Sequence, residues 1–286
     1  MPPIPKLAKA PGVTITERAP AKINLALHIR RKRSDGYHDL ETLFAFARDG
    51  DTIMIGRAER NSLTITGPFA AGLEGENLVS RAAVAFATDF AVAQPHAITL
   101  DKHLPIASGI GGGSADAAAT LRGLARLHGV DPLDERLFAI AARLGSDVPA
   151  CLLGRPSLGL SRGERLDPLP PFGDLPLLLV NPRVPLSTAA MFATWDRVDH
   201  GPIPAGGAVL ERAAQGRNDF TAPAIAVAPV VGDVLALLEQ ATGATLARMS
   251  GSGATCFALF TDAATRDRAA READRAGWWT LATTLD

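Results

Sequence analysis

The segment 104–119, with the sequence LPIASGIGGGSADAAA, constrains this chain more than any other stretch. Its four glycines are followed directly by alanine-rich sequence that favours a helix. Glycine lets the backbone approach a ligand closely, because it has no Cβ atom. The first turn of a helix presents unpaired N–H groups and the positive end of the helix dipole. Together these features predict an anion site, most often one for the phosphates of a nucleotide.

Three better-known glycine motifs do not fit this segment. A Walker A loop needs a Gly-Lys pair, and the chain contains none. In a dinucleotide fingerprint counted from Gly109, Ser114 would stand at the last glycine position. A nucleophile elbow fails because Asp116 follows Ser114 where a glycine is required. A flexible linker is the remaining alternative, but linkers seldom carry an apolar leader and a helix start. A phosphate-binding loop is therefore the favoured interpretation.

Composition excludes several classes of partner. The 286 residues include 29 basic and 30 acidic ones, so no basic excess points to nucleic acid or to a membrane surface. No apolar run approaches the roughly 18 residues that would cross a bilayer. Cys151 and Cys256 lie in apolar runs without metal-ligand spacing, and we expect buried, reduced thiols, which suit the cytoplasm. Residues 1–12 have the character of a proline-broken tail without the apolar centre of a signal peptide.

The pattern of apolar residues predicts an α+β protein with two mixed domains. A proline-dense stretch at 168–176 sets the expected boundary, giving domains 1–167 and 168–286. Alternating and β-branched runs predict strands at 13–17, 23–29, 51–55, 63–66, 97–100, 177–180, 244–250, 255–260 and 278–283. Helical periodicity predicts helices at 77–90, 114–128, 134–144, 188–196, 208–214, 230–242 and 264–276.

Two polar clusters near the N-terminus are candidate parts of a functional site. In PAKINLALHI, Lys22 and Asn24 alternate with apolar residues, so they share one face of the expected strand. In KRSDGYHDLETLF, an Asp-Gly turn projects Tyr37, the only tyrosine of the chain, and His38. The first cluster is compatible with a surface lysine or a functional one. The second is compatible with an edge pair or with a ring ligand.

Two further clusters lie later in the chain. In LGSDVPACLLG, Asp147 stands between a helix end and an apolar segment, where it could be a helix cap or a general base. RMSGSGATCFALF places a second glycine-serine turn between two expected strands. That turn is a hairpin that could also border a ligand.

The order of PAKINL, the glycine-rich loop and MSGSGAT resembles the three motifs of the GHMP kinase superfamily. The finer sequence details RSDGYHDLETLF, GGGSADAA, LGSDVPA and RNDF (217–220) resemble the kinases of 4-diphosphocytidyl-2-C-methyl-D-erythritol. This resemblance extends from about residue 13 to the end of the chain. It implies the two-domain GHMP fold, with an N-terminal domain like domain 2 of ribosomal protein S5 and a C-terminal ferredoxin-like domain.

The resemblance also implies an activity: ATP-dependent phosphorylation of the 2-hydroxyl of this cytidylyl compound in the non-mevalonate isoprenoid pathway. Asp147 would accept the hydroxyl proton, and Lys22 would lie beside it and the transferring phosphoryl group. Asn24 would orient the polyol, while Tyr37 and Phe192 would clamp the cytosine and His38 would contact its polar edge. A core position is the alternative for Phe192. The triphosphate would lie on the loop residues Pro105, Ile106, Ala107, Ser108, Gly109, Ile110, Gly111, Gly112, Gly113, Ser114 and Ala115.

The loop departs from the general superfamily pattern at Gly112 and Gly113, where serines are frequent. Only Ser114 is left to offer a hydroxyl to a metal. Ser114 and Asp116 could help to hold Mg²⁺, but capping of the helix is the simpler role for both. We therefore expect no metal site made by the protein, and Mg²⁺ that arrives with ATP.

Two other functions remain as alternatives. One is another GHMP kinase of the homoserine or mevalonate type, which the Tyr37-His38 element disfavours. The other is a nucleotide-binding module without catalysis, which the presence of both Lys22 and Asp147 disfavours. The expected partner is a small-molecule substrate, and the sequence is compatible with a monomer or a homodimer.

Overall fold

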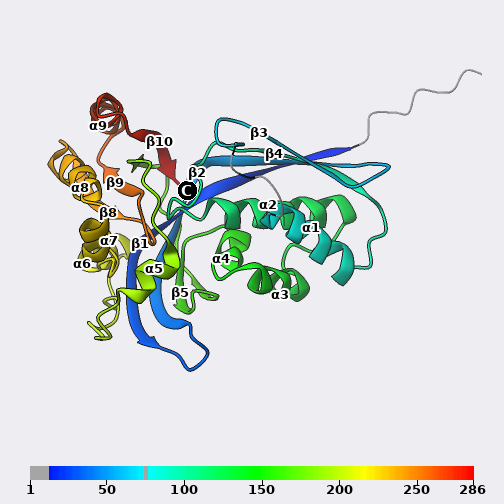
Figure 1. The fold of residues 1–286 in the computed structure, drawn as a ribbon, viewed down its shortest axis with the longest axis horizontal. Coiled ribbons are helices and arrows are strands. Elements are labelled where there is room, and N and C mark those ends of the chain that lie inside the picture. Colours follow the sequence, from blue (N-terminus) through cyan, green and yellow to red (C-terminus); the bar gives the residue numbers. More distant parts are fainter. Residues whose placement is uncertain (1–12, 72, 74–76) are drawn as a thin grey trace, which may run out of the picture.

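The computed structural model describes residues 13–71, 73 and 77–286, so the expected tail at 1–12 lies outside the described residues. Two long antiparallel strands, β1 (Thr14–Lys32) and β2 (His38–Arg57), run through the molecule and contribute to both of its halves (Figure 1). β4 (His96–Asp101) pairs with the second half of β2, and β3 (Ser62–Thr66) lies parallel to β4. The hairpin of β5 (Ser157–Ser161) and β6 (Arg165–Pro168) pairs with the first half of β2.

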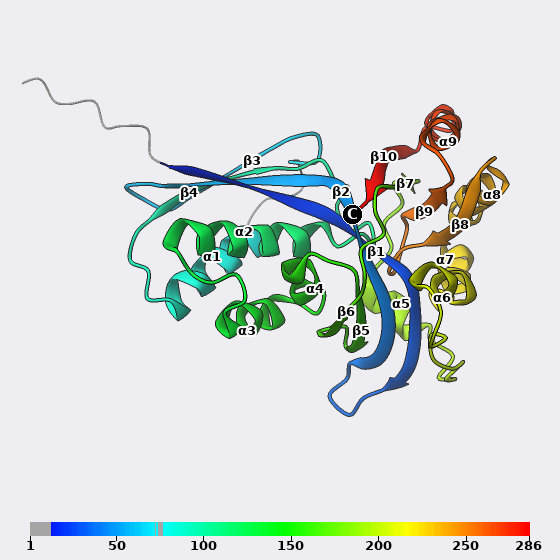
Figure 2. The same ribbon diagram turned by 180° about the vertical axis from the view of Figure 1, so that it is seen from behind.

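Four helices cover one face of this N-terminal sheet (Figures 1 and 2). They are α1 (Leu78–Asp89), α2 (Gly112–His128), α3 (Glu135–Leu144) and α4 (Val148–Leu153). The longest, α2, packs directly on β1 and β2. Its alanines allow this close approach, and ten of its residues are buried.

The C-terminal half is an antiparallel sheet with helices on its outer side, except for one short helix that lies beside β1 and β5 (Figures 1 and 2). The sheet has the strand order β10-β7-β9-β8. Its strands are β7 (Leu175–Asn181), β8 (Ala244–Met249), β9 (Cys256–Phe260) and β10 (Trp279–Leu285). The helices are α5 (Thr188–Ala193), α6 (Val209–Gln215), α7 (Thr221–Val227), α8 (Val230–Gln240) and α9 (Ala263–Arg275). Leu285 of β10 pairs with Ala47 of β2, which connects the two sheets.

β2 is longer than the strand predicted at 51–55, and the reason lies in how its side chains alternate. Phe44 and Phe46 enter the core beneath α2. Leu43, Ala45 and Ala47 enter a second core formed with β7 and β9. A strand with an apolar core on each face lacks the apolar–polar alternation by which strands are usually recognised. The first half of β2 is therefore not recognisable as a strand from the sequence pattern.

The strands predicted at 13–17 and 23–29 are one strand, because a register shift between Pro20 and Lys22 accommodates the proline. The hairpin β5–β6 and the short helices α4 and α7 were not predicted. The helix predicted at 188–196 ends at Ala193. The remaining predicted elements form with small shifts of their ends. β6 ends at Pro168 and β7 begins at Leu175, and the domain boundary at 168 stays a prediction.

Cys151 and Cys256 are free and buried, as expected. Burial raises the pKa of the Cys151 thiol to about 12, so this thiol is protonated at neutral pH. Among the residues described, none of the helices combines the length and apolarity needed to cross a membrane.

A tight contact between β1 and β2 at Gly50 gives a prediction about stability. A Cβ atom on Gly50 would lie 2.1 Å from the carbonyl oxygen of Ala19 and 2.7 Å from Cα of Pro20. We expect Gly50→Ala to lower the free energy of unfolding by about 1–3 kcal/mol, because backbone must move to relieve the clash. Gly56→Ala on the same strand is the control, since its Cβ would meet nothing nearer than 3.7 Å. Urea denaturation of both variants measures the difference, and equal stabilities would contradict the close packing.

Candidate active site

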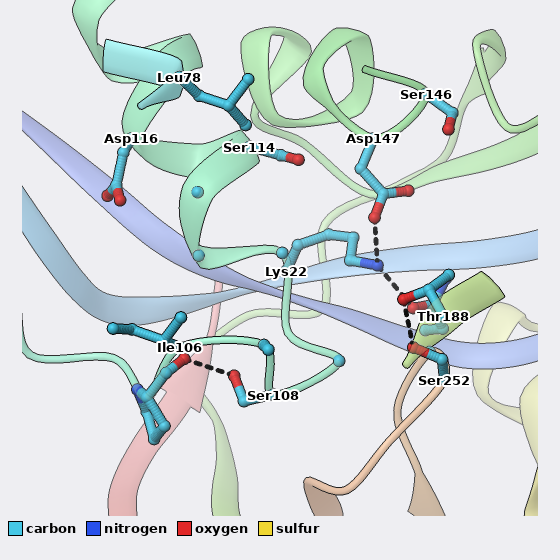
Figure 3. A pocket seen from close by; sticks show the side chains of 18 of the residues that line it. Lys22, Leu78, Ile106, Ser108, Ser114, Asp116, Ser146, Asp147, Thr188 and Ser252 are labelled. Carbon is cyan, nitrogen blue, oxygen red and sulfur yellow. Dashed lines mark hydrogen bonds and ion pairs between the residues drawn. The ribbon is translucent and has the colours of Figure 1, made fainter. Parts of the chain in front are cut away.

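A cavity of about 620 Å³ lies where β1, the glycine-rich loop, the start of α4 and the glycine-serine turn of residues 250–253 come together. Figure 3 shows Lys22 and Asp147 pointing toward each other across it, with the glycine-rich loop beside them. Most of the predicted site residues contribute to its lining. They are Lys22, Asn24, Pro105, Ile106, Ala107, Ser108, Gly109, Gly111, Gly112, Gly113, Ser114, Asp147 and Phe192.

Two predicted loop residues have side chains that point elsewhere. Ile110 belongs to the core formed with β7 and β9, and Ala115 belongs to the core beneath α2. Both side chains are essentially buried. These two residues anchor the loop on opposite sides, so only their backbone is available to a ligand.

The glycine-rich loop leads directly into α2, as predicted, although the helix begins at Gly112 rather than at Ser114. Gly111 is the N-cap residue, and no side chain caps this helix end. Neither Ser114 nor Asp116 therefore acts as the expected cap. The first N–H groups of α2 lie beside the cavity, where they and the helix dipole favour an anion.

The loop is held against the glycine-serine turn. The N–H of Thr255 donates to the carbonyl of Ser108 at 3.1 Å, and Ser250 Oγ donates to the carbonyl of Gly109 at 3.1 Å. A Cβ atom on Gly109 would lie 2.5 Å from the carbonyl oxygen of Ser250, so glycine is required by this contact. Gly251 and Ser252 of the turn line the cavity. The turn is thus both a hairpin and a border of the site.

Lys22 and Asp147 form the central polar contact. Lys22 is buried, and its Nζ donates to Asp147 Oδ2 at 3.0 Å and to Asn24 Oδ1 at 2.7 Å. Asn24 Nδ2 in turn donates to Thr42 Oγ1 at 2.7 Å. Asp147 is the N-cap residue of α4, yet its side chain makes no cap hydrogen bond. Its carboxylate, which is 38% exposed, is thus oriented by Lys22 and open to a substrate.

The aromatic residues lie at the other end of the cavity. Phe192 of α5 stacks on His38, with ring centroids 4.8 Å apart and planes 16° from parallel. Phe220 meets the ring of Phe192 edge-on at 4.8 Å. Partial burial, followed by the charge of Lys32, lowers the pKa of His38, which favours the neutral ring. Unlike the expected arrangement, His38 rather than Tyr37 faces Phe192.

Tyr37 lies beside the cavity rather than on its lining and is 52% exposed. The guanidinium of Arg162, which does line the cavity, lies over the Tyr37 ring with Cζ 4.8 Å from the centroid. Tyr37 can therefore reach a ligand only at the rim. Its position follows from the Asp-Gly turn that the sequence predicted.

Two further lining residues carry an unpartnered polar atom: Asn77, which was not among the predicted site residues, and Asp116, which was considered only as a helix cap or an Mg²⁺ ligand. Asn77 uses its Oδ1 to cap α1, which leaves Nδ2 buried without a partner. Asp116 accepts a hydrogen bond from Lys102 through Oδ2, which leaves Oδ1 buried without a partner. Buried polar atoms without partners are rare and call for an explanation. The sequence predicted that Asn77 caps the helix. It could not show that the Nδ2 group of Asn77 has no hydrogen-bond partner.

Apolar residues line the same cavity as Asn77 and Asp116. They are Leu73, Leu78, Val79 and Leu100. Burial, reinforced by the nearby Asp51, raises the pKa of Asp116, and the Lys102 ammonium opposes this by stabilising the carboxylate. This end of the cavity suits a flat ring that offers both hydrogen-bond donors and acceptors.

Comparison with known proteins agrees with this geometry. Residues 77–155 match the model of the GHMP kinase N-terminal domain, and residues 205–277 match that of the GHMP kinase C-terminal domain. The 4-diphosphocytidyl-2-C-methyl-D-erythritol kinase of Rhizorhabdus wittichii is 53% identical, over 96% of each chain. The enzyme of the same name from Novosphingobium aromaticivorans is 46% identical, over 98% of this chain and 95% of its own. The chain belongs to the 4-diphosphocytidyl-2-C-methyl-D-erythritol kinase family of GHMP kinases.

Solved structures of this family and superfamily show the same fold. A crystal structure of a 4-(cytidine 5'-diphospho)-2C-methyl-D-erythritol kinase matches with a TM-score of 0.80 and 34% identity, over 95% of this chain and 99% of that one. A homoserine kinase from Cytophaga hutchinsonii matches with a TM-score of 0.65 but only 19% identity, which reflects the fold alone. The chain is therefore a kinase of the two-domain GHMP fold that uses ATP to phosphorylate a hydroxyl group of a small molecule.

The RNDF segment (217–220) holds the glycine-serine turn in place. Asn218 is buried, and its Nδ2 donates to the carbonyls of Met249 at 2.7 Å and Gly251 at 2.8 Å. Its Oδ1 accepts from the N–H of Phe220 at 3.0 Å. One amide thus links the turn beside the phosphate loop to Phe220, which packs on Phe192.

This linkage gives a prediction for Asn218→Asp, which keeps the shape of the side chain but replaces its donor with an acceptor. The carbonyls of Met249 and Gly251 would lose their partner and face a carboxylate oxygen. Since leaving buried polar groups unsatisfied costs about 1–3 kcal/mol, we expect a loss of stability in that range or above. Thermal and urea denaturation measure it. Wild-type stability of Asn218→Asp would argue that the two bonds contribute nothing.

Proposed function

We propose that this enzyme transfers the γ-phosphoryl group of ATP to the 2-hydroxyl of 4-diphosphocytidyl-2-C-methyl-D-erythritol. The observation that carries the proposal is the buried Lys22 paired with Asp147 at 3.0 Å, directly beside an uncapped helix N-terminus that can bind phosphate. The names of the relatives supply the acceptor. We place this reaction in the cytoplasm.

The nucleotide would lie along the loop side of the cavity. Its phosphates would accept hydrogen bonds from backbone N–H groups between Ser108 and Ser114. Its adenine would enter the apolar end, where Asn77 Nδ2 can donate to a ring nitrogen and Asp116 Oδ1 can accept from the exocyclic amine. This arrangement gives both unpartnered atoms a partner.

Mg²⁺ would enter with the nucleotide. Among the described residues, no group of three or more His, Cys, Asp or Glu side chains could hold a metal ion. Asp116 already pairs with Lys102, and Ser114 on the first turn of α2 offers a hydroxyl to the cavity. Such a donor set suits a cation held mainly by phosphate oxygens and water. When bound, Mg²⁺ would neutralise charge on those oxygens.

The acceptor would lie between the catalytic pair and the aromatic end. Its 2-hydroxyl would give its proton to the Asp147 carboxylate as the hydroxyl oxygen attacks the γ-phosphorus, and ADP would leave. Lys22 would orient Asp147 and offset negative charge on the transferring group. The cytosine would enter the aromatic end, where Phe192 and His38 stack on each other and Tyr37 can contact the base from the rim.

A direct assay tests the proposed acceptor. We expect ATP consumption with 4-diphosphocytidyl-2-C-methyl-D-erythritol and none with mevalonate or homoserine. Turnover of either of the other acceptors, together with no response to the cytidylyl compound, would defeat the proposal.

The catalytic role of Asp147 predicts the effect of Asp147→Asn. This change preserves size but removes the proton acceptor, so we expect kcat to fall by about 10²–10⁴-fold while ATP still binds. Asp134→Asn is a matched control, because Asp134 is the N-cap residue of α3 and lies outside the cavity. Steady-state kinetics and calorimetric titration with ATP measure the two effects. Near wild-type turnover of Asp147→Asn would show that another group takes the proton.

The aromatic end predicts selective loss of acceptor binding. Since stacking on a base contributes about 1–3 kcal/mol, Phe192→Ala and Tyr37→Ala should each raise the dissociation constant of the cytidylyl substrate by roughly tenfold. ATP affinity serves as the internal control and should not change. His38→Ala should reduce the preference for cytidine over uridine analogues. Unchanged acceptor binding in all three variants would place the cytosine elsewhere.

A further inference from the structure

We propose that Asp51 and Lys102 are positioning residues that fasten both ends of the phosphate loop to β2 and thereby set the affinity for ATP. No sequence motif marks either residue as part of the site. The inference rests on the nucleotide site proposed above.

Asp51 holds the start of the loop. Its side chain is fully buried in β2, and Oδ1 accepts from the N–H groups of His103 at 2.5 Å and Leu104 at 2.8 Å. These are the two residues immediately before the loop begins at Pro105. A single carboxylate oxygen thus fixes the backbone direction with which the chain enters the loop.

Lys102 connects the same carboxylate to the far end of the loop. Its Nζ donates to Asp51 Oδ2 at 2.5 Å and to Asp116 Oδ2 at 2.7 Å. Asp116 lies on the second turn of α2, after the loop has passed over the cavity. A Cβ atom on Gly112 would lie 3.0 Å from this Nζ, so the ammonium group lies against the first residue of the helix. The start of the loop is therefore tied to β2 directly by the Asp51 carboxylate, and its far end is tied to the same carboxylate through Lys102.

Burial argues for a positioning role. The side chains of Asp51, Lys102 and Asp116 are each no more than 4% exposed. Buried ion pairs lose their hydration, so their net contribution to folding is often small. Here two carboxylates share a single ammonium group, which leaves one negative charge in excess. The cluster is therefore expected to contribute even less to the free energy of folding. What the cluster does provide is fixed geometry.

Fixed geometry matters at this site because the loop has no lysine of its own for phosphate. The ammonium of Lys102 is occupied by two carboxylates, so binding depends on backbone N–H groups that must already point at the phosphates. Ordering a flexible loop at the moment of binding would reduce affinity. A loop held at both ends avoids that cost.

The test is Asp51→Asn, which keeps the shape but cannot accept from Lys102 and both N–H groups at once. We expect the dissociation constant of a non-hydrolysable ATP analogue to rise about tenfold or more, with acceptor affinity unchanged. Amide hydrogen exchange within 104–115 should become faster. We expect Lys102→Gln to show the same loss of ATP affinity and the same faster exchange. This variant replaces Asp51→Asn in the test if Asp51→Asn does not fold.

Asp49→Asn is the matched control. Asp49 lies on the same strand, and its carboxylate accepts from Thr283 Oγ1 at 2.6 Å, away from the loop. We expect wild-type ATP affinity and loop exchange in this variant. A lower melting temperature of folded Asp51→Asn or Lys102→Gln with unchanged ATP affinity would mean a structural role only and would overturn the proposal. Equal losses for ATP and acceptor would overturn it as well.

Amide hydrogen exchange in the wild-type enzyme distinguishes failure of this proposal from failure of the nucleotide site on which it rests. If the ATP analogue does not slow exchange in the loop of the wild-type enzyme, the nucleotide site itself is misplaced. If the analogue protects the loop but neither variant loses affinity, the site stands and only the role of Asp51 and Lys102 fails.

Discussion

The pairing of β1 with β2 is the constraint on which the rest of this structure depends. The two strands pair from Thr14 opposite Gly56 to Lys32 opposite His38, with three register shifts along the way. Side chains of β2 alternate between the core beneath α2 and the core shared with β7 and β9. A slip of one residue would exchange these two sets, placing phenylalanines where alanines fit. The register is therefore fixed by two cores at once.

This register also builds the site. It sets Asn24 opposite Phe44 and Lys22 opposite Phe46, so the polar residues of β1 lie over an aromatic stretch of β2. Lys22 Nζ lies 5.4 Å from the centre of the Phe44 ring, in surroundings with little water. An ion pair in such surroundings is stronger than in water but costly to leave unpaired. The partner that satisfies Lys22, Asp147, arrives from 125 residues further along the chain.

The glycine-rich loop has no lysine within residues 105–115, so it differs from phosphate loops that use a lysine of their own. In the proposed site the phosphates would be bound by backbone groups at a helix start, and the loop carries four glycines. Such a loop depends on its surroundings for shape: the glycine-serine turn packs on one side, and Asp51 with Lys102 holds both ends. The chemistry of the site is thus spread over segments that are distant in sequence.

The sequence by itself determined the local features: the glycine-rich loop, the helix that follows it, the strand carrying Lys22 and Asn24, and the family resemblance that pointed to Asp147. These are encoded by neighbouring residues, through backbone freedom and periodicity. Only the tertiary structure decided that β2 is twice buried, that His38 faces Phe192, that Asp116 pairs with Lys102 instead of capping α2, and that Asn77 keeps a free amide. Each of these depends on which side chains meet after the chain has packed. That outcome is set by register and by competition for hydrogen-bond partners, neither of which is present in a local sequence pattern.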